Sequence, residues 1–280
     1  MGKGLLDPKV DFVFKNIFGS PNHPEILISF LNATLKAKKK IVNVDIKKTD
    51  IEKQYIEDKY SRLDVKATTS NDEIINIEIQ LKNENNMVKR SLYYLSKMYE
   101  EQLNEKEDYS KLVRTVCINI LNFKYLKTDN FHTGYRFKEI ESNEELTDIM
   151  EVHFIEIPKL QDSSDEKDML VAWTEFLKDP ESEKVRGLEL SIEEIRQAKD
   201  ELIRMSNDST QRELYDMRAN SLRDKMSELN AAERKGIEKG REEGRKEEKI
   251  KIARNMKLSG LDTNTIAKIT NLSEDEIDKL

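Results

Sequence analysis

The sequence predicts an α/β protein of the α+β type, with a mixed β-sheet flanked by helices and a helical C-terminal extension. Helical and strand patterns alternate as far as about residue 160, which is typical of a sheet with helices packed on its faces. Strand patterns stop after Asp165, and only helical patterns follow. The chain has 280 residues, enough for one sizeable domain and an appendage.

The first elements are two helices and a strand. The stretch "DPKVDFVFKNIFGS" has apolar residues at helical spacing from Val10 to Phe18 and ends at Gly19, a common helix stop. A second helix is expected from about Pro24 to Leu35. The lysine-rich "KAKKK" follows, and "IVNVDIK" then has the pattern of a strand.

The stretch "RLDVKATTSNDEIINIEIQ", residues 62–80, predicts an antiparallel hairpin. Apolar and polar residues alternate twice around the turn-forming "TSND". With the turn centred on Asn71, Asp64 lies opposite Glu78 and Lys66 opposite Asn76, away from the aliphatic face. This register is an assumption, because a slip of one residue would put the two acids on opposite faces of the sheet.

Two acids at opposed positions need a compensating charge. Carboxylates on Cβ atoms about 5 Å apart repel each other. A divalent cation relieves the repulsion, because Mg²⁺ binds one or two carboxylates together with waters and phosphate oxygens. The alternative is a solvated polar face on which Arg62 and Lys66 neutralise the acids. The spacing by itself leaves both explanations open.

The remaining elements complete the mixed sheet. A helix is expected in "NNMVKRSLYYLSKMYEEQLN", residues 85–104, which sets Arg90, Tyr94 and Lys97 at positions i, i+4 and i+7. The apolar "RTVCINILNF" predicts a strand buried on both faces. Two more strands are expected in "YRFKEI" and "IMEVHFIEIPKL", and helices around Trp173 and over residues 191–228.

Composition narrows the class of protein. The chain has 48 basic and 55 acidic residues, a net charge of −7, so any contact with nucleic acid must be local. No apolar run is long enough for a membrane span, and "MGKGLLDPKV" lacks the apolar core of a signal peptide, so we expect a cytoplasmic protein with no membrane contact. Cys117 is expected in the core, and His23, His132 and His153 on the surface or in loops, since they lack metal-ligand spacing.

Four motifs in this order carry a resemblance to a known family. "KVDFVFKNIFG", "RLDV", "NIEIQ" and "KRSLYYLSKMY" closely resemble the Rpn family, the recombination-promoting nucleases also described as PD-(D/E)XK nuclease family transposases. The resemblance covers roughly residues 5–180. It implies a restriction-endonuclease-like fold and hydrolysis of DNA phosphodiester bonds with Mg²⁺, or alternatively Mn²⁺. It also suggests a role in recombination or against mobile DNA, with little sequence specificity.

The resemblance also implies roles for single residues. Asp64 and Glu78 match the catalytic acids that hold the metal, and the backbone carbonyl of Ile79 is expected to point between them. Gln80 occupies the position where the superfamily often has lysine, and this substitution puts the rate in doubt. A neutral amide can orient a water molecule but brings no positive charge to the transition state.

Other residues are candidates for metal or substrate contacts. Asp11 matches an early family motif and is expected to hold the metal through water, although pairing with Lys15 on the helix surface is an alternative. Arg90 and Lys97 are expected to supply charge at DNA phosphates, together with the "KAKKK" lysines, and Tyr94 to hydrogen-bond there. The alternative is core packing for Tyr94 and solvated charges for Arg90 and Lys97.

The C-terminal region predicts a separate role. "AAERKGIEKGREEGRKEEKIK" indicates a long charged helix with glycines at positions 236, 240 and 244, and the last residues resemble a helix-turn-helix unit. Its final helix, "SEDEIDKL", is acidic and therefore repelled by phosphates. We therefore expect a homodimer formed through the C-terminal helices. The expected domains are a nuclease-like core over 1–180, a helical extension over 181–230 and an oligomerisation tail over 231–280.

Two other classes of function stay open from sequence. The chain could be a catalytically silent DNA-binding module that keeps the nuclease fold. It could also be a protein-interaction scaffold organised by its C-terminal helices. Cleavage that depends on both Mg²⁺ and Asp64 distinguishes the enzyme from both alternatives.

Overall fold

The computed structural model describes residues 4–36, 39–47, 64–165 and 167–280. The chain divides into two compact units, Met1–Ala219 and Asn220–Leu280. Within the described residues, no helix is both long enough and apolar enough to cross a membrane.

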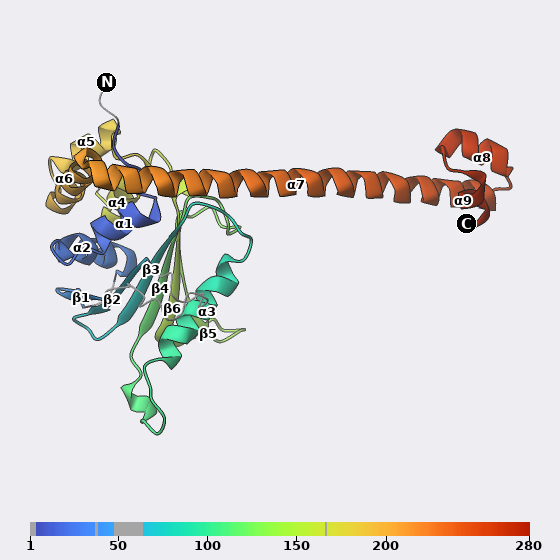
Figure 1. Cartoon of the computed structure of the whole chain (residues 1–280). Coiled ribbons are helices and arrows are strands. Elements are labelled where there is room, and N and C mark those ends of the chain that lie inside the picture. The colour runs from blue at the N-terminus through green and yellow to red at the C-terminus, as the bar shows by residue number, and fades with distance from the viewer. Residues whose placement is uncertain (1–3, 37–38, 48–63, 166) are drawn as a thin grey trace. The chain divides into compact units, whose positions relative to one another are not determined.

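The first unit is built on a mixed six-stranded sheet with strand order β1-β2-β3-β4-β6-β5 (Figure 1). The three central strands, β3, β4 and β6, run parallel, and the other neighbours are antiparallel. This is the mixed sheet that the sequence predicts. The strands are β1 (Val44–Lys47), β2 (Val65–Thr69), β3 (Ile74–Gln80), β4 (Thr115–Leu121), β5 (His132–Lys138) and β6 (Glu145–Glu156).

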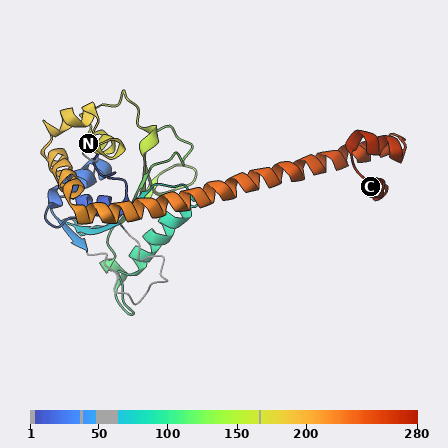
Figure 2. The ribbon, with the colours of Figure 1, turned by 45° about the horizontal axis from the view of Figure 1, so that its top comes forward.

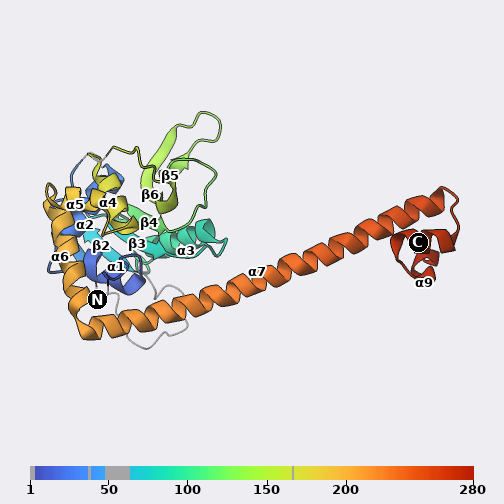
Figure 3. The ribbon, with the colours of Figure 1, turned by 90° about the horizontal axis from the view of Figure 1, so that it is seen from above.

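Helices cover both faces of the sheet. Figure 3 shows α3 on one face and α1, α2 and α4 on the other, and Figure 2 shows α5 and α6 packed beside α1 and α2. The helices of this unit are α1 (Asp11–Phe18), α2 (Pro24–Leu35), α3 (Met87–Glu100), α4 (Met169–Lys178), α5 (Glu183–Glu189), α6 (Glu193–Asn207) and the first turns of α7 (Ser209–Leu258). Two short 3₁₀ helices, η3 (Tyr109–Lys111) and η4 (Ile157–Lys159), lie in the connections.

Two hydrophobic cores hold these layers together. On one face, Met87 and Leu95 of α3 pack against Cys117, Leu121 and Phe154 of β4 and β6. On the other face, Phe18, Phe30 and Trp173 from α1, α2 and α4 meet edge to face at centroid distances of 5.3–6.5 Å. Such aromatic pairs are more favourable than their buried area alone implies.

Local sequence signals place the early elements correctly. Helix α1 ends at Gly19, where a Cβ atom would lie only 2.6 Å from the carbonyl oxygen of Lys15, so the helix stop there favours glycine. Helix α2 has the predicted bounds. In the hairpin, Val65 pairs with Ile77 and Lys66 with Asn76, which confirms the predicted register.

The second unit contains the end of α7 with α8 (Thr263–Thr270) and α9 (Glu274–Asp278). Its small core consists of Ala253, Ile266, Leu272 and Ile277. Helix α9 begins with a capping box, in which the side chains of Ser273 and Glu276 bond reciprocally to each other's backbone N–H groups. Local capping and this compact core define the unit.

Candidate functional site

The hairpin brings Asp64 and Glu78 to neighbouring positions on two adjacent strands. Asp64 lies directly before β2, one position beyond the pair of Val65 and Ile77, and so faces Glu78 of β3. Its carboxylate accepts a hydrogen bond of 2.8 Å from the backbone N–H of Ile79. In a strand the N–H and C=O of one residue point to the same side, so the Ile79 carbonyl also faces the β2 side.

Glu78 is fully buried, at 0% exposure, beneath α3. One carboxylate oxygen, Oε2, accepts a hydrogen bond of 3.1 Å from Nε of Arg90. The other, Oε1, is buried and has no hydrogen-bond partner in the part of the chain that the structure describes. A buried carboxylate oxygen without a partner is costly, and a bound cation would satisfy it. The solvated polar face considered from sequence does not describe this acid.

The surroundings disfavour the charged form of both acids. Burial raises the pKa of Asp64 to about 8, and the nearby Glu78 raises it further. Burial also raises the pKa of Glu78 to about 7, although the Arg90 guanidinium opposes this shift. Paired acids with raised pKa values are typical of functional sites. A divalent cation between them would restore the charged forms at neutral pH.

The ligand set suits a hard cation of the Mg²⁺ type. Two carboxylates and one backbone carbonyl leave room for waters and a phosphate oxygen, which Mg²⁺ commonly retains. Among residues 4–36, 39–47, 64–165 and 167–280, no cluster of three or more His, Cys, Asp or Glu residues could hold a metal ion. The acid pair is therefore a site to be completed by water and substrate rather than a closed protein cage.

Asp11 of α1 lies close enough to Asp64 to raise its pKa. Its Oδ2 atom forms an ion pair of 3.1 Å with Arg218 of α7. The sequence analysis considered only Lys15, four residues away, as the partner of this acid. Arg218 is 207 positions away along the chain, and no local pattern could have identified it.

The predicted substrate residues on α3 do not share one environment. Arg90 contacts Glu78, and its guanidinium carbon lies 5.3 Å from the centre of the Tyr94 ring. Tyr94 is 3% exposed, so its burial favours core packing, the alternative considered from sequence. Lys97 is partly exposed and pairs with Glu100 at 3.1 Å and Glu101 at 3.9 Å. Of the three, only Arg90 directly contacts one of the acids.

Gln80 ends β3 two positions after Glu78 and is partly exposed. Side chains two positions apart on a strand share a face, so Gln80 lies on the same face as Glu78. An amide here can orient water next to the acids but cannot replace the charge of a lysine. This placement agrees with the role that the resemblance implies for Gln80, which stays a proposal.

A row of buried polar side chains behind Glu78 was not anticipated from sequence. Asn76, Ser91 and Asn119 are each 0% exposed. The Ser91 hydroxyl donates to the Asn119 side-chain carbonyl at 2.9 Å, linking α3 to β4. Asparagine at positions 76 and 119, each within an otherwise apolar strand, is the signal that could have indicated this row. The network holds α3 at a fixed place over the acid-bearing strand.

The histidine expectation was wrong for His153, which is 4% exposed and lies in β6. Its ring bonds to Glu151 at 2.7 Å and to His132 of β5 at 2.9 Å. Arg114 bridges Glu73 and Glu151, so the network crosses β3, β4 and β6. Its charges compensate one another. We interpret it as a tie between strands, at the opposite end of β3 from Glu78.

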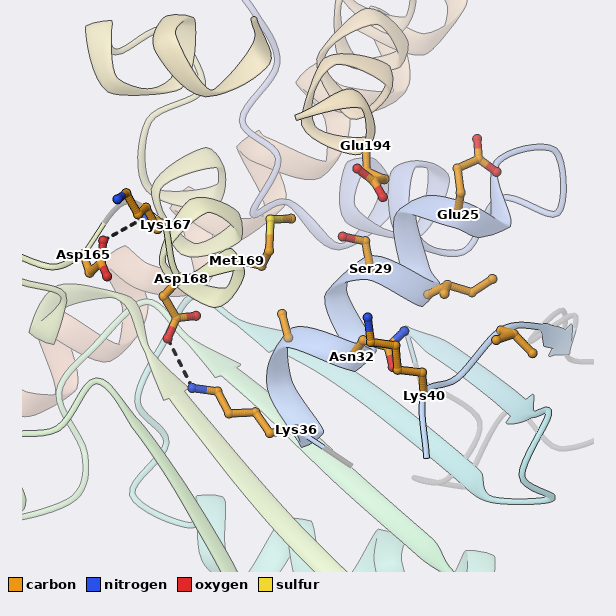
Figure 4. Close-up of a pocket in the computed structure, with 13 residues that line it drawn as sticks. Glu25, Ser29, Asn32, Lys36, Lys40, Asp165, Lys167, Asp168, Met169 and Glu194 are labelled. Carbon is orange, nitrogen blue, oxygen red and sulfur yellow. Dashed lines mark hydrogen bonds and ion pairs between the residues drawn. The ribbon is translucent and has the colours of Figure 1, made fainter. Parts of the chain in front are cut away.

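A hollow of about 780 Å³ lies between α2, α4 and α6 (Figure 4). Lys36 and Lys40 of the "KAKKK" stretch line it, and Lys36 pairs with Asp168 at 3.2 Å. These two lysines belong to the α2 side of the sheet, whereas Arg90 and Lys97 lie on α3, on the other face. The single DNA surface predicted from sequence for these residues is therefore wrong. Lys38 lies outside the described residues, as does Arg62, the proposed neutraliser of the acids.

Comparison with protein families gives two matches. Residues 8–232 match the family described as PD-(D/E)XK nuclease family transposase. Residues 246–280 match the family described as Rpn/YhgA-like nuclease family, C-terminal HTH domain. No curated protein and no solved structure matches the chain. The first match includes every residue of the candidate site, and the second covers α8, α9 and the end of α7.

Proposed function

The chain belongs to the PD-(D/E)XK nuclease family transposases, and from this membership we propose that it is a Mg²⁺-dependent DNA endonuclease with little sequence specificity. The observation that carries the proposal is the acid pair, in which a buried Glu78 oxygen without a partner faces the Asp64 position. Mn²⁺ is an alternative metal, because it accepts similar oxygen ligands.

Each residue of the site has a role in this proposal. Asp64, Glu78 and the Ile79 carbonyl hold the metal, and Asp11 orients a water bound to it. When bound, a divalent cation here would polarise a phosphate oxygen and lower the pKa of the attacking water. Gln80 orients that water by hydrogen bonding. Arg90 holds Glu78 in place and adds positive charge beside the cleaved phosphate.

The family description as a transposase supports a role in recombination or against mobile DNA. Such a role would place the protein in the cytoplasm, in contact with DNA. Two alternatives keep the same fold without cleavage, namely a silent DNA-binding module and a protein-interaction scaffold. The absence of a lysine at position 80 is the feature of this chain that keeps the silent module under consideration.

Nicking of a supercoiled plasmid tests the proposal. We expect the full chain to nick the plasmid with Mg²⁺, to stop in EDTA, and to lose this activity in Asp64→Ala. Asp129→Asn, which changes an exposed acid elsewhere, is the matched control and should nick at the parent rate. DNA binding that ignores Mg²⁺ and both acids would instead support the silent module. Oligomers without DNA affinity would support the scaffold.

The C-terminal helix-turn-helix domain bears on partners. This class of domain commonly binds DNA through its second helix. In this chain the first turn of α9 carries Glu274, Asp275 and Glu276, which oppose a close approach to phosphates. The homodimer predicted from sequence has no support in the family matches, which favour a DNA-binding role. Dimerisation through these helices therefore remains a proposal with its own test.

Truncation after Leu229 separates dimerisation from DNA binding by the tail. A Cβ atom added at Gly236, Gly240 or Gly244 would meet no neighbouring atom within the described chain, so this stretch of α7 has room for a partner helix. If the tail dimerises, light scattering should show a dimer for the full chain and a monomer after truncation, with plasmid nicking retained. A truncated protein that stays dimeric, or a tail that binds DNA tightly at physiological salt, would contradict the dimer proposal.

A further inference from the structure

A chain of contacts runs along α3 away from the acid pair. Glu78 bonds to Arg90, and the Arg90 guanidinium lies over the buried ring of Tyr94. The Tyr94 ring in turn meets the Tyr93 ring edge to face, with a centroid distance of 5.7 Å and an interplanar angle of 61°. The Tyr93 ring therefore has a defined neighbour that orients it, and it lies two contacts from the residue that holds Glu78.

Unlike Tyr94, Tyr93 presents its side chain to solvent at 49% exposure. Lys89 and Lys97 lie four residues before and after it, so the three side chains form one row with about 6 Å between neighbours along the helix axis. Lys89 is exposed, and the ion pairs of Lys97 with Glu100 and Glu101 are surface pairs that exchange at little cost. The row thus has a cation, an aromatic ring and a second cation.

We propose that the row Lys89, Tyr93 and Lys97 binds an unpaired DNA strand, with one base stacked on the Tyr93 ring and the neighbouring phosphates on the two lysines. This combination of ring and cations is how proteins bind single strands without reading sequence. The proposal deepens the function proposed above and rests on it for the substrate, since the row leads from the acid pair.

The exposed ring selects unpaired over paired DNA. In a duplex each base face is covered by its neighbours, so a protein ring can stack on a base only at an end, a frayed segment or a flipped nucleotide. Lysines, by contrast, neutralise the phosphates of either form. Tyr93 therefore predicts a substrate that is single-stranded or locally opened beside the cleaved bond. Leu92 and Val88, 49% and 41% exposed, extend the apolar surface on the same helix.

Binding of fluorescein-labelled oligo(dT), compared with a duplex of equal length, tests this inference in EDTA, where no cleavage occurs. For the full chain, Tyr93→Ala should weaken oligo(dT) binding about 5- to 150-fold, the range that one base–aromatic stack is worth. Tyr93→Phe and Tyr93→Trp keep a ring and should retain the affinity. Tyr109→Ala removes an 81% exposed tyrosine in η3 and is the matched control.

The same assay has outcomes that overturn the inference. Unchanged oligo(dT) binding by Tyr93→Ala would remove the row from the substrate site and leave it as a surface for a protein partner. An equal loss in Tyr93→Phe would show a hydroxyl contact instead of stacking. An equal loss on the duplex, to which the helix-turn-helix domain contributes identically in every variant, would remove the preference for an unpaired strand.

These results are distinguishable from a failure of the proposed nuclease function. A protein that binds oligo(dT) through Tyr93 but never nicks DNA would keep the inference and lose the nuclease. A protein that nicks DNA with unchanged oligo(dT) binding in Tyr93→Ala would do the reverse. Neutralising Lys89 and Lys97 together should flatten the salt dependence of oligo(dT) binding by a slope of about 1.4, that is about 0.7 for each phosphate contact. An unchanged slope would also contradict the inference.

Discussion

Replacing Glu78 with glutamine should lower Mg²⁺-dependent cleavage by about 100-fold or more, the loss typical of removing one preorganised charged contact in an active site. The substitution keeps the volume of a fully buried side chain and removes only its charge. The amide can still accept a hydrogen bond from Arg90, so the packing of α3 over β3 should survive. What it cannot do is bind a divalent cation as a carboxylate does.

Gln80→Ala is the comparison for this result. Gln80 lies on the same face of β3 but is neutral, so its removal should slow cleavage less than Glu78→Gln does. Circular dichroism and the thermal midpoint of each variant check that the fold is retained. Cleavage by Glu78→Gln at the parent rate would show that the acids are not the metal site.

The second large effect is on stability against pH in the absence of metal. The folded pKa values of Asp64 and Glu78, about 8 and about 7, lie above their ordinary values of 3.8 and 4.5. For an acid raised in this way, the stabilising contribution is fully present below the ordinary pKa and is lost as pH rises through the folded one. Metal-free protein should therefore lose this contribution between about pH 4 and pH 8, with a lower thermal midpoint by about 2–4 °C for each kcal/mol.

Other groups titrate over the same range, so the comparison between variants is what carries this prediction. Burial lowers the pKa of His132 to about 4, and that residue gains stability as the pH rises. Asp64→Asn lacks one of the two raised acids and should lose less stability than the parent as pH rises. Added Mg²⁺ should restore the parent at pH 8 and have a smaller effect on Asp64→Asn, since it binds the charged acids. Identical pH dependence in both proteins would contradict the raised pKa of Asp64.

The parts of the fold that could be predicted from sequence are those set by local patterns. Apolar spacing and the stop at Gly19 define α1, and the alternation on both sides of Asn71 defines the hairpin register. That register alone places Asp64 opposite Glu78. The acid pair could therefore be identified before any tertiary contact was known, because its geometry depends only on two adjacent strands.

The depth of the site could not be predicted, because it depends on how separate elements pack. The hairpin pattern suggests that Glu78 faces solvent, whereas α3 covers it completely. On α3 itself, helical spacing favoured Tyr94 as the substrate residue, and the structure exposes Tyr93 instead. Neighbouring helix positions differ by 100°, so only the docked orientation of the helix decides which ring is buried.

Contacts between distant parts of the chain were also beyond sequence reasoning. The ion pair of Asp11 with Arg218 joins the first helix to α7, and no periodic pattern relates two such positions. The same holds for His132 and His153, which lie on different strands and meet only in the folded sheet. Their spacing in the sequence suggested unrelated surface residues, because the pairing of β5 with β6 is what brings the rings together.

The most direct test of the central claim is anomalous scattering from crystals of the full chain soaked in Mn²⁺. The account predicts a strong peak between the carboxylates of Asp64 and Glu78, within about 2.0–2.3 Å of an oxygen of each and of the Ile79 carbonyl oxygen. The peak should be absent in crystals of Glu78→Gln. A peak at another place, or a peak that persists in Glu78→Gln, would contradict the claim that these two acids hold the metal.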